Sequence, residues 1–293
     1  MRVLVTGCKG QVGQALVKRL NHCTELLALD RATLDITNKK NVQIVVSDFQ
    51  PDFIINAAAY TAVDKAEVEV EHAYAINRDG TRNLAEAANE IEATFIHIST
   101  DYVFSGLADE PYLESDPTDP LSVYGISKLA GEEAIRIVNP HHIILRTSWV
   151  FSEDGNNFVK TMLRLAKNKS QLSIVHDQRG GPTYAGDIAD TLVRMTETLF
   201  KEKDSTLFGT YHYSGMPTVS WYEFAQAIFV EAQKHGVEHI PELRAITSVE
   251  YPTPAARPKN SALNTDKIYN KFGISPSNWM SSLNKLDEFI DKL

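Results

Sequence analysis

The chain has 293 residues, of which 43% are apolar, enough for one large α/β domain with a smaller satellite. A net charge of −9 argues against nucleic acid as the main partner. With no signal-peptide pattern, no apolar run near the roughly 18 residues that span a membrane, and two cysteines outside any CxxC pattern, the sequence predicts a cytoplasmic protein without a membrane partner.

Short apolar strands alternate with helical patterns through the first half of the chain. In chain order, the sequence predicts strands at residues 2–6, 25–29, 53–56, 94–99 and 142–145, with helices at residues 11–20, 40–49, 72–91 and 122–138 between them. Apolar strands joined by helices are typical of a parallel sheet that is covered on both faces. We therefore predict an α/β fold with a Rossmann-like, doubly wound parallel sheet.

The second half of the chain is less regular. Its pattern predicts helices at residues 157–166, 186–200 and 220–234 and from Trp279 onward, and strands at residues 172–175 and 210–214. We predict a dinucleotide-binding domain at residues 1–150 and a smaller, mainly substrate-binding domain at residues 151–293. Elements around residues 184–215 are expected to return to the first domain, so that the two domains are partly interleaved.

A glycine-rich turn follows the first strand and opens the first helix. Gly7, Gly10 and Gly13 stand in a GxxGxxG spacing, which differs from the GxGxxG of ordinary dehydrogenases. Glycines at such a turn let the backbone approach a pyrophosphate, which the helix N-terminus attracts. The turn therefore predicts a nucleotide cofactor, with a glycine-rich turn that binds nothing as the alternative.

Acidic and small residues end the next two strands. Asp30 ends the second strand, where a carboxylate usually accepts the ribose hydroxyls of a dinucleotide. Arg31 follows and could pair with a 2′-phosphate instead, which leaves NAD and NADP both open. After the third strand, Ala57 and Ala59 are small enough for a cofactor to lie against the backbone. Both strand ends are therefore assigned to the predicted cofactor site.

Tyr124 and Lys128 lie four residues apart on a predicted helix and so share one face. An ammonium group favours a phenolate, which would lower the pKa of the tyrosine towards neutrality. A phenol tuned in this way can exchange a proton with a sugar oxygen. Thr100, at the end of the fourth strand, is expected to place a hydroxyl beside Tyr124. A surface helix with a solvated lysine, and a turn closed by the threonine, are the structural alternatives.

Together these features resemble the extended short-chain dehydrogenase/reductase family. A TGxxGxxG turn, small residues after a middle strand, Ser/Thr after the next strand and a YxxxK helix occur in that order. Longer segments at residues 7–13, 56–67, 99–104, 124–132, 146–151, 177–183 and 257–261 are similar to the dTDP-4-dehydrorhamnose reductases within it. The resemblance implies reduction of a dTDP-linked 4-keto sugar, dTDP-4-dehydro-β-L-rhamnose, to dTDP-β-L-rhamnose, with NADPH or NADH as cofactor.

The resemblance also implies roles for individual residues. Tyr124 would be the proton donor, Lys128 its tuner and Thr100 a contact of the carbonyl oxygen. The cofactor contacts it implies are Gly7, Gly10, Gln11, Val12, Gly13, Asp30, Asp35, Ile36, Ala57, Ala59, Tyr60, Thr61, Tyr124 and Lys128. The substrate contacts it implies are Thr100, Asp101, Tyr102, Val103, Trp149 and Arg257.

Other proteins of the same superfamily remain as alternatives. The 4,6-dehydratases resemble this chain but have a glutamate, which supports proton abstraction, where this chain has Tyr102. Further alternatives are another sugar-nucleotide reductase, a 4-epimerase, and an NADP-binding regulatory subunit similar to that of methionine adenosyltransferase. The intact set of Asp101, Trp149 and Arg257 favours an enzyme over a binding module.

A metal ion and the oligomeric state are separate expectations. Some members of the family that this chain resembles are dimers that bind a divalent ion through glutamates. One of those glutamates lies on the first helix. Here that helix has Ala15 and no acid between Gly13 and Leu20, and the nine histidines form no HExxH-like group. We therefore expect no bound metal, while a homodimer stays compatible with the resemblance.

Overall fold

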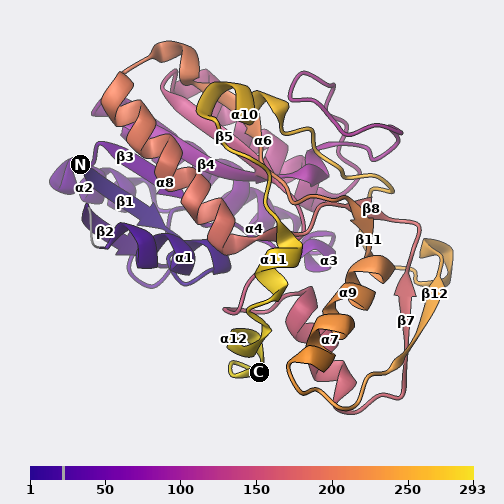
Figure 1. Cartoon of the computed structure of the whole chain (residues 1–293). Helices are drawn as coiled ribbons and strands as arrows, with labels where there is room; N and C mark the ends of the chain where they lie inside the picture. Colours follow the sequence, from indigo (N-terminus) through magenta and orange to yellow (C-terminus); the bar gives the residue numbers. More distant parts are fainter. Residues whose placement is uncertain (22–23) are drawn as a thin grey trace.

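A six-stranded parallel sheet forms the centre of the protein (Figure 1). The structure is a computed structural model that describes residues 1–21 and 24–293, so Cys23 lies outside the described residues. The strands lie in the order β2-β1-β3-β4-β5-β10, and every neighbouring pair is parallel. Their bounds are β1 (Arg2–Thr6), β2 (Glu25–Leu29), β3 (Phe53–Asn56), β4 (Thr94–Thr100), β5 (His142–Thr147) and β10 (Gly209–His212). The predicted parallel sheet is confirmed.

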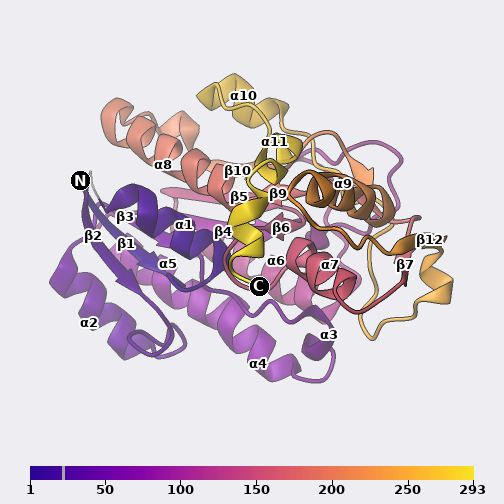
Figure 2. The ribbon, with the colours of Figure 1, turned by 60° about the horizontal axis from the view of Figure 1, so that its bottom comes forward.

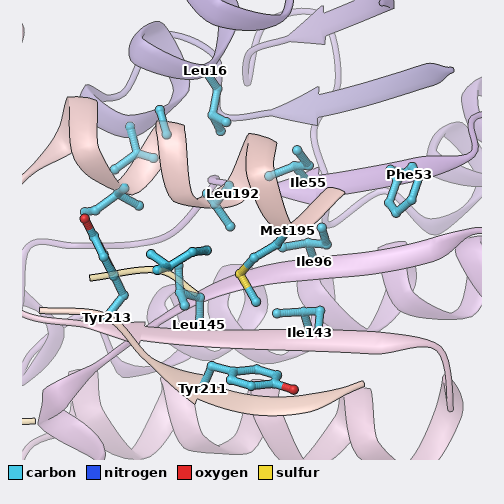
Figure 3. Close-up of a cluster of buried hydrophobic side chains, with 14 of the residues drawn as sticks. Leu16, Phe53, Ile55, Ile96, Ile143, Leu145, Leu192, Met195, Tyr211 and Tyr213 are labelled. Atoms are coloured by element: carbon cyan, nitrogen blue, oxygen red, sulfur yellow. The ribbon is translucent and has the colours of Figure 1, made fainter. Parts of the chain in front are cut away.

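Helices cover both faces of this sheet (Figure 2). One face carries α1 (Gln11–Leu20) and α8 (Ala185–Glu202), and the other carries α2 (Lys39–Phe49), α5 (Thr81–Glu90) and α6 (Val123–Val138). Figure 3 shows the first layer, in which Ile55 of β3 packs in the same cluster as Leu192 of α8. The next residue along β3, Ile54, belongs to the cluster of the opposite layer. Burial on both faces explains why these strands are continuous apolar runs.

The order in which successive strands are added to the sheet reverses at β1. The strands β2 and β3 lie on opposite sides of β1, so the connections after β1 and β2 run to different sides. A crevice opens at the carboxyl ends of the strands at such a point, and ligands of open α/β sheets bind there. Thr6 and Asn56 are register partners at this edge, as are Thr100 and Thr147 further along it.

A second hydrophobic cluster lies beside the sheet, in the later part of the chain. Its elements include α7 (Phe158–Ala166), β7 (Gln171–Val175), α9 (Trp221–Lys234), β12 (Glu242–Ile246), α11 (Trp279–Leu283) and α12 (Leu286–Ile290). The ring of Phe224 packs edge-on against Trp279 in this cluster. Ser220 caps α9 in a capping box with Glu223, so this helix begins next to the predicted first residue, 220. Between these elements, α8 and β10 return to the main sheet (Figure 2).

Two predicted helices differ from the structure. The helix predicted at residues 72–91 starts earlier, as α4 (Val70–Tyr74), and passes through a π-helical segment, η1 (Ala75–Gly80), before α5. Within η1 the Asn77 amide accepts from the N–H of Tyr60 and donates to its carbonyl and to the hydroxyl of Ser127. The predicted final helix is interrupted at Asn284, which separates α11 from α12. Both differences arise from local backbone geometry to which hydrophobic periodicity is insensitive.

β12 and the elements not yet described have no counterpart among the predicted ones. The strand β12 is mostly exposed, so its sequence lacks a clear alternation, and α10 (Asp266–Phe272) has only seven residues. The remaining short elements are α3 (Val63–Ala66), η2 (Asp101–Val103), β6 (Val150–Phe151), β8 (Arg179–Gly180), β9 (Thr183–Tyr184), η3 (Ser205–Leu207), β11 (Val219–Ser220) and η4 (Ser248–Glu250). Within the described ranges, no helix has both the length and the apolar character that crossing a bilayer requires.

Candidate active site

The glycine-rich turn between β1 and α1 is shaped for an anion. Gly7 has φ +71°, and a Cβ there would lie 2.5 Å from the backbone nitrogen of Ala58. Gly10 is the N-cap of α1 and offers no side-chain cap, and the first turn holds no acidic residue. The first-turn N–H groups, at Gln11 and Val12, are therefore open to a negatively charged group. This geometry fits the pyrophosphate of a dinucleotide.

Two adjoining cavities run along the carboxyl ends of the strands. The cavity of about 490 Å³ lies over β2, and the cavity of about 540 Å³ lies over β4 and the start of α6. They share the lining residues Lys9, Gly10, Ala57, Ala59 and Thr61, so they form one continuous cleft. An extended cofactor could place its adenosine half in the first cavity and its reactive half in the second.

Most predicted site residues line this cleft. The first cavity collects Gly7, Gly10, Asp30, Asp35, Ile36, Ala57, Ala59, Tyr60 and Thr61. The second collects Gly10, Gln11, Val12, Ala57, Ala59, Thr61, Thr100, Asp101, Tyr102, Tyr124, Lys128 and Trp149. Residues expected to contact a cofactor and residues expected to contact a substrate therefore meet in one place.

Three predicted contacts lie outside both cavities. A Cβ on Gly13 would lie 2.1 Å from the carbonyl oxygen of Gly7, so this glycine allows the turn to pack on its own helix. Val103 is fully buried in a small cluster with Phe104. Arg257 lies in the segment between η4 and α10 and forms an ion pair with Asp64 of α3, at 2.8 Å from its Oδ2.

The carboxylate of Asp30 is already engaged. Its Oδ1 accepts the N–H groups of Ala32 and Thr33 and the hydroxyl of Thr33, and its Oδ2 pairs with Lys9. The lysine is the main reason that the pKa of Asp30 falls to about 2. Lys9 and the exposed Arg31 therefore place positive charge at the mouth of the first cavity. A 2′-phosphate would meet these cations rather than a bare carboxylate.

Tyr124 and Lys128 both line the second cavity, as their spacing predicts, but their pKa values differ from the prediction. Burial raises the pKa of Tyr124 to about 12, although the neighbouring Thr100 hydroxyl offsets part of this rise. Burial lowers the pKa of Lys128 to about 7. The lysine Nζ is held by His97 Nε2 at 3.0 Å and by the carbonyl of Ile98 at 2.7 Å. The predicted lowering of the tyrosine pKa is therefore wrong for this structure, because desolvation dominates.

Polar groups without partners form the floor of the second cavity. Asp101 Oδ1 accepts the hydroxyl of Thr100 at 3.0 Å, but its Oδ2 is buried without a hydrogen-bond partner in the described part of the chain. The hydroxyl of Thr147 is likewise buried without a hydrogen-bond partner among the described residues. Buried polar atoms normally have partners, so these two mark where the polar atoms of a ligand would bind. Thr147 is not among the predicted site residues, although parallel strands that end at the same edge place it beside Thr100.

Asp101 should make stability depend on pH. Burial raises its pKa from 3.8 to about 7, so the folded chain holds this proton more tightly than the unfolded chain does. As the pH rises from about 4 to about 7, the unfolded chain loses this proton before the folded chain does, so the free energy of unfolding falls. We expect Asp101→Asn to gain about 2 to 3 kcal/mol relative to wild type between roughly pH 5 and pH 8. Urea unfolding across this range measures the gain, with the exposed Asp109→Asn as control; a difference that stays constant with pH contradicts it.

Trp149 lines the second cavity and stacks on a second indole behind it, that of Trp221. Trp149 has φ +46°, a conformation that is uncommon outside glycine, and its ring lies 3.4 Å from that of Trp221, at an interplanar angle of 4°. A Cβ on Gly180 would come within 2.5 Å of the Trp149 indole, so the glycine leaves room for the ring. Strained backbone of this kind clusters at ligand sites. Among the described residues, no group of three or more metal-ligating side chains is placed to hold an ion.

Comparison with known proteins identifies the family. A family model described as "RmlD substrate binding domain" matches residues 1–292. The dTDP-4-dehydrorhamnose reductase of Aggregatibacter actinomycetemcomitans is 50% identical over 293 residues, 99% of each chain. The enzyme of that name from Escherichia coli K12 is 43% identical over 291 residues, 98% of this chain and 97% of its own.

Solved structures agree with these matches. The dTDP-4-dehydrorhamnose reductase of Clostridium acetobutylicum superposes with a TM-score of 0.92 at 38% identity, covering 99% of this chain and 100% of its own. The Bacillus anthracis protein of that name, in complex with NADP, has a TM-score of 0.90 at 39% identity and 99% coverage of both chains. UDP-glucose 4-epimerase of Thermus thermophilus, at 21% identity and a TM-score of 0.82, shares the fold alone. The chain belongs to the dTDP-4-dehydrorhamnose reductase family.

Proposed function

We propose that this chain reduces the 4-keto group of dTDP-4-dehydro-β-L-rhamnose, with NADPH as the preferred cofactor, to give dTDP-β-L-rhamnose. One observation carries the proposal: a single cleft joins the anion-binding turn to Tyr124, Lys128 and Thr100. The Bacillus anthracis relative binds NADP, and the residues lining this cleft fit the same cofactor. A nucleotide turn and a proton donor in one cleft are what hydride and proton transfer to a carbonyl require.

The side chains of the second cavity divide the work of the reduction. When bound, the cofactor supplies the hydride. The hydroxyls of Thr100 and Tyr124 would hold the 4-keto oxygen between them, and Tyr124 would deliver the proton to it. A pKa of about 12 keeps the phenol protonated and ready to donate. A protonated Lys128 would stabilise the phenolate that develops, so it acts mainly in the transition state.

Tyr102 favours reduction over dehydration. Its ring meets that of Tyr124 edge-on, with centroids 5.5 Å apart, at the position where the related dehydratases have glutamate. Burial raises the pKa of Tyr102 well above its usual value, so the phenol is a poor base near neutral pH. Removing a proton from the sugar ring needs a base within reach. The described residues of the second cavity offer a protonated phenol there instead.

A coupled assay tests the proposed reaction against its alternatives. We expect NADPH absorbance to fall only when a dTDP-linked 4-keto sugar is present, and more slowly with a UDP-linked analogue. Conversion of dTDP-glucose with retained cofactor would indicate an epimerase or dehydratase. Absence of turnover together with tight binding to a second enzyme would favour the regulatory subunit.

Lys9 should set part of the cofactor preference. Its ammonium pairs with Asp30 at the mouth of the first cavity and would face the 2′-phosphate of NADPH. We expect Lys9→Ala to lower the ratio of kcat/KM for NADPH to that for NADH by about fivefold, as an exposed ion pair allows. Initial rates with each cofactor measure this ratio. Lys201→Ala removes an exposed lysine on α8 that lines neither cavity and should leave the ratio unchanged; an equal loss in both variants contradicts the assignment.

A further inference from the structure

A chain of buried polar side chains crosses the sheet beneath the cleft and ends at Lys128. The hydroxyl of Thr6 on β1 donates to Asn56 Oδ1 on β3 at 2.7 Å, and Asn56 Nδ2 lies 3.1 Å from Nδ1 of His97 on β4. His97 Nε2 then lies 3.0 Å from Lys128 Nζ. Each of these four residues is at most 2% exposed. Thr6, Asn56 and His97 line neither cavity, so the protons they share must lie between protein atoms, without help from bulk water.

The backbone fixes the first member of this chain. The amide of Asn56 could in principle be turned either way, but the N–H of Ala58 points at its Oδ1, at 3.0 Å. A backbone N–H is always a donor, so the atom facing it must be the carbonyl oxygen. The NH₂ group of Asn56 is therefore the atom that faces His97, and it can only donate.

The asparagine in turn fixes the proton of His97. Its Nδ1 receives a hydrogen bond from Asn56 and must present a lone pair, so Nδ1 carries no proton. Burial holds the pKa of His97 well below its usual value, so the ring is neutral. A neutral imidazole has one N–H, and here that proton is on Nε2.

The proton on Nε2 points at a lysine nitrogen that needs a lone pair to accept it. An ammonium group has three donors and no acceptor, so a protonated Lys128 would put two donors face to face. A neutral amine satisfies both contacts, because its lone pair accepts from His97 while one N–H donates to the carbonyl of Ile98. We propose that His97 is a positioning residue that holds Lys128 as a neutral amine in the free enzyme and thereby sets the pH range over which the lysine cation can stabilise the Tyr124 phenolate.

The surroundings of Lys128 agree with this assignment. Burial lowers its pKa to about 7, in the direction that a hydrogen bond to the neutral form also favours. Glu132, on the same helix, raises this pKa, but its carboxylate is already paired with Arg146 on β5 and Arg136 on α6. Asp101 of η2 acts instead on Tyr124, whose pKa it raises.

The protonation state of Lys128 should control the pH dependence of the proposed reduction, and this step rests on the proposed function. Since Tyr124 becomes a phenolate as it gives up its proton, the rate should be highest when Lys128 is protonated. The rate should then fall as the pH rises through the pKa of the lysine. His97 determines where that alkaline decline begins, because its N–H stabilises only the uncharged amine.

Neutron diffraction tests the proton positions without any variant or any turnover. Crystals of the whole chain are exchanged into D₂O at about pH 8.5. This pH is above the pKa of Lys128, which is about 7. We expect a deuteron on His97 Nε2, none on its Nδ1, and two on Lys128 Nζ. A deuteron on Nδ1, or three on Nζ, overturns the inference. Because the measurement needs no substrate, its failure is distinct from a failure of the proposed function.

Two substitutions test the kinetic consequence. His97→Leu removes the donor, and Asn56→Asp offers Nδ1 an acceptor so that Nε2 turns its lone pair to the lysine. Both should move the alkaline decline of kcat/KM, which reports groups of the free enzyme, up by roughly one pH unit, the size expected for one lost hydrogen bond to the neutral form. Thr81→Val removes the other contact of Asn56 Nδ2, at 3.4 Å, and should leave the decline in place. A uniform loss of activity at every pH, in both variants, would mean that His97 has only a structural role.

Discussion

Replacing Tyr124 by phenylalanine should lower kcat by about 10²- to 10⁴-fold, the contribution typical of a positioned general acid. The variant keeps the ring, which lies edge-on to Tyr102, and loses only the hydroxyl. Burial raises the pKa of that hydroxyl to about 12, so it is protonated near neutral pH and can donate. NADPH affinity should change little, because the anion-binding turn and the first cavity are untouched. Steady-state rates together with fluorescence titration of NADPH separate the two effects.

Tyr102→Phe provides the matched control for this substitution. It removes a hydroxyl from the same cavity and leaves Tyr124 in place. We expect a loss of less than about tenfold, because this phenol would contact the substrate without transferring a proton. If the two variants lose equal activity, or if Tyr124→Phe retains near full rate while folded, the assigned proton donor is wrong.

Replacing Gly13 by alanine should destabilise the folded chain. Alanine is favoured over glycine within a helix by about 1 kcal/mol, so helix propensity alone predicts a gain. A Cβ at this position, however, would lie 2.1 Å from the carbonyl oxygen of Gly7 and 2.8 Å from Cys8 Cα. Both are backbone atoms, which cannot move without opening the turn. We therefore expect a net loss of about 2 to 3 kcal/mol in the free energy of unfolding, measured by urea denaturation.

Gly10→Ala separates stability from ligand binding at the same turn. Gly10 has φ −73°, and a Cβ there would lie 3.3 Å from the Gly7 carbonyl, which a small shift can relieve. Because Gly10 lines both cavities, the added methyl should weaken NADPH binding while stability stays close to wild type. A stable Gly13→Ala protein with impaired binding would show that Gly13 contacts the cofactor after all.

Much of the fold follows from local sequence signals. The strands at residues 2–6, 25–29 and 53–56 have the predicted bounds. The first and third are buried and so are continuous apolar runs, while the edge strand at residues 25–29 is apolar but only partly buried. The glycine turn and the position of Tyr124 at the start of α6 follow in the same way. Ser122 accepts the N–H of Gly125 and so begins α6 at the predicted position.

The properties that depend on three-dimensional contacts could not be predicted. The spacing of Tyr124 and Lys128 placed them together but gave the wrong direction for the tyrosine pKa, because desolvation depends on the packed surroundings. His97 belongs to an ordinary apolar strand in the sequence, and only the register of β3 and β4 reveals its contact with Asn56. The stack of Trp149 on Trp221 likewise joins residues seventy-two positions apart.

Deuterium transfer tests the central claim of a 4-keto reduction most directly. The enzyme is incubated with cofactor that carries deuterium at the transferable position of the nicotinamide, together with dTDP-4-dehydro-β-L-rhamnose, and the product is analysed by NMR and mass spectrometry. We expect one deuterium per molecule of dTDP-β-L-rhamnose, at carbon 4 of the sugar. Deuterium at another carbon, or a changed sugar with the label still on the cofactor, would contradict it.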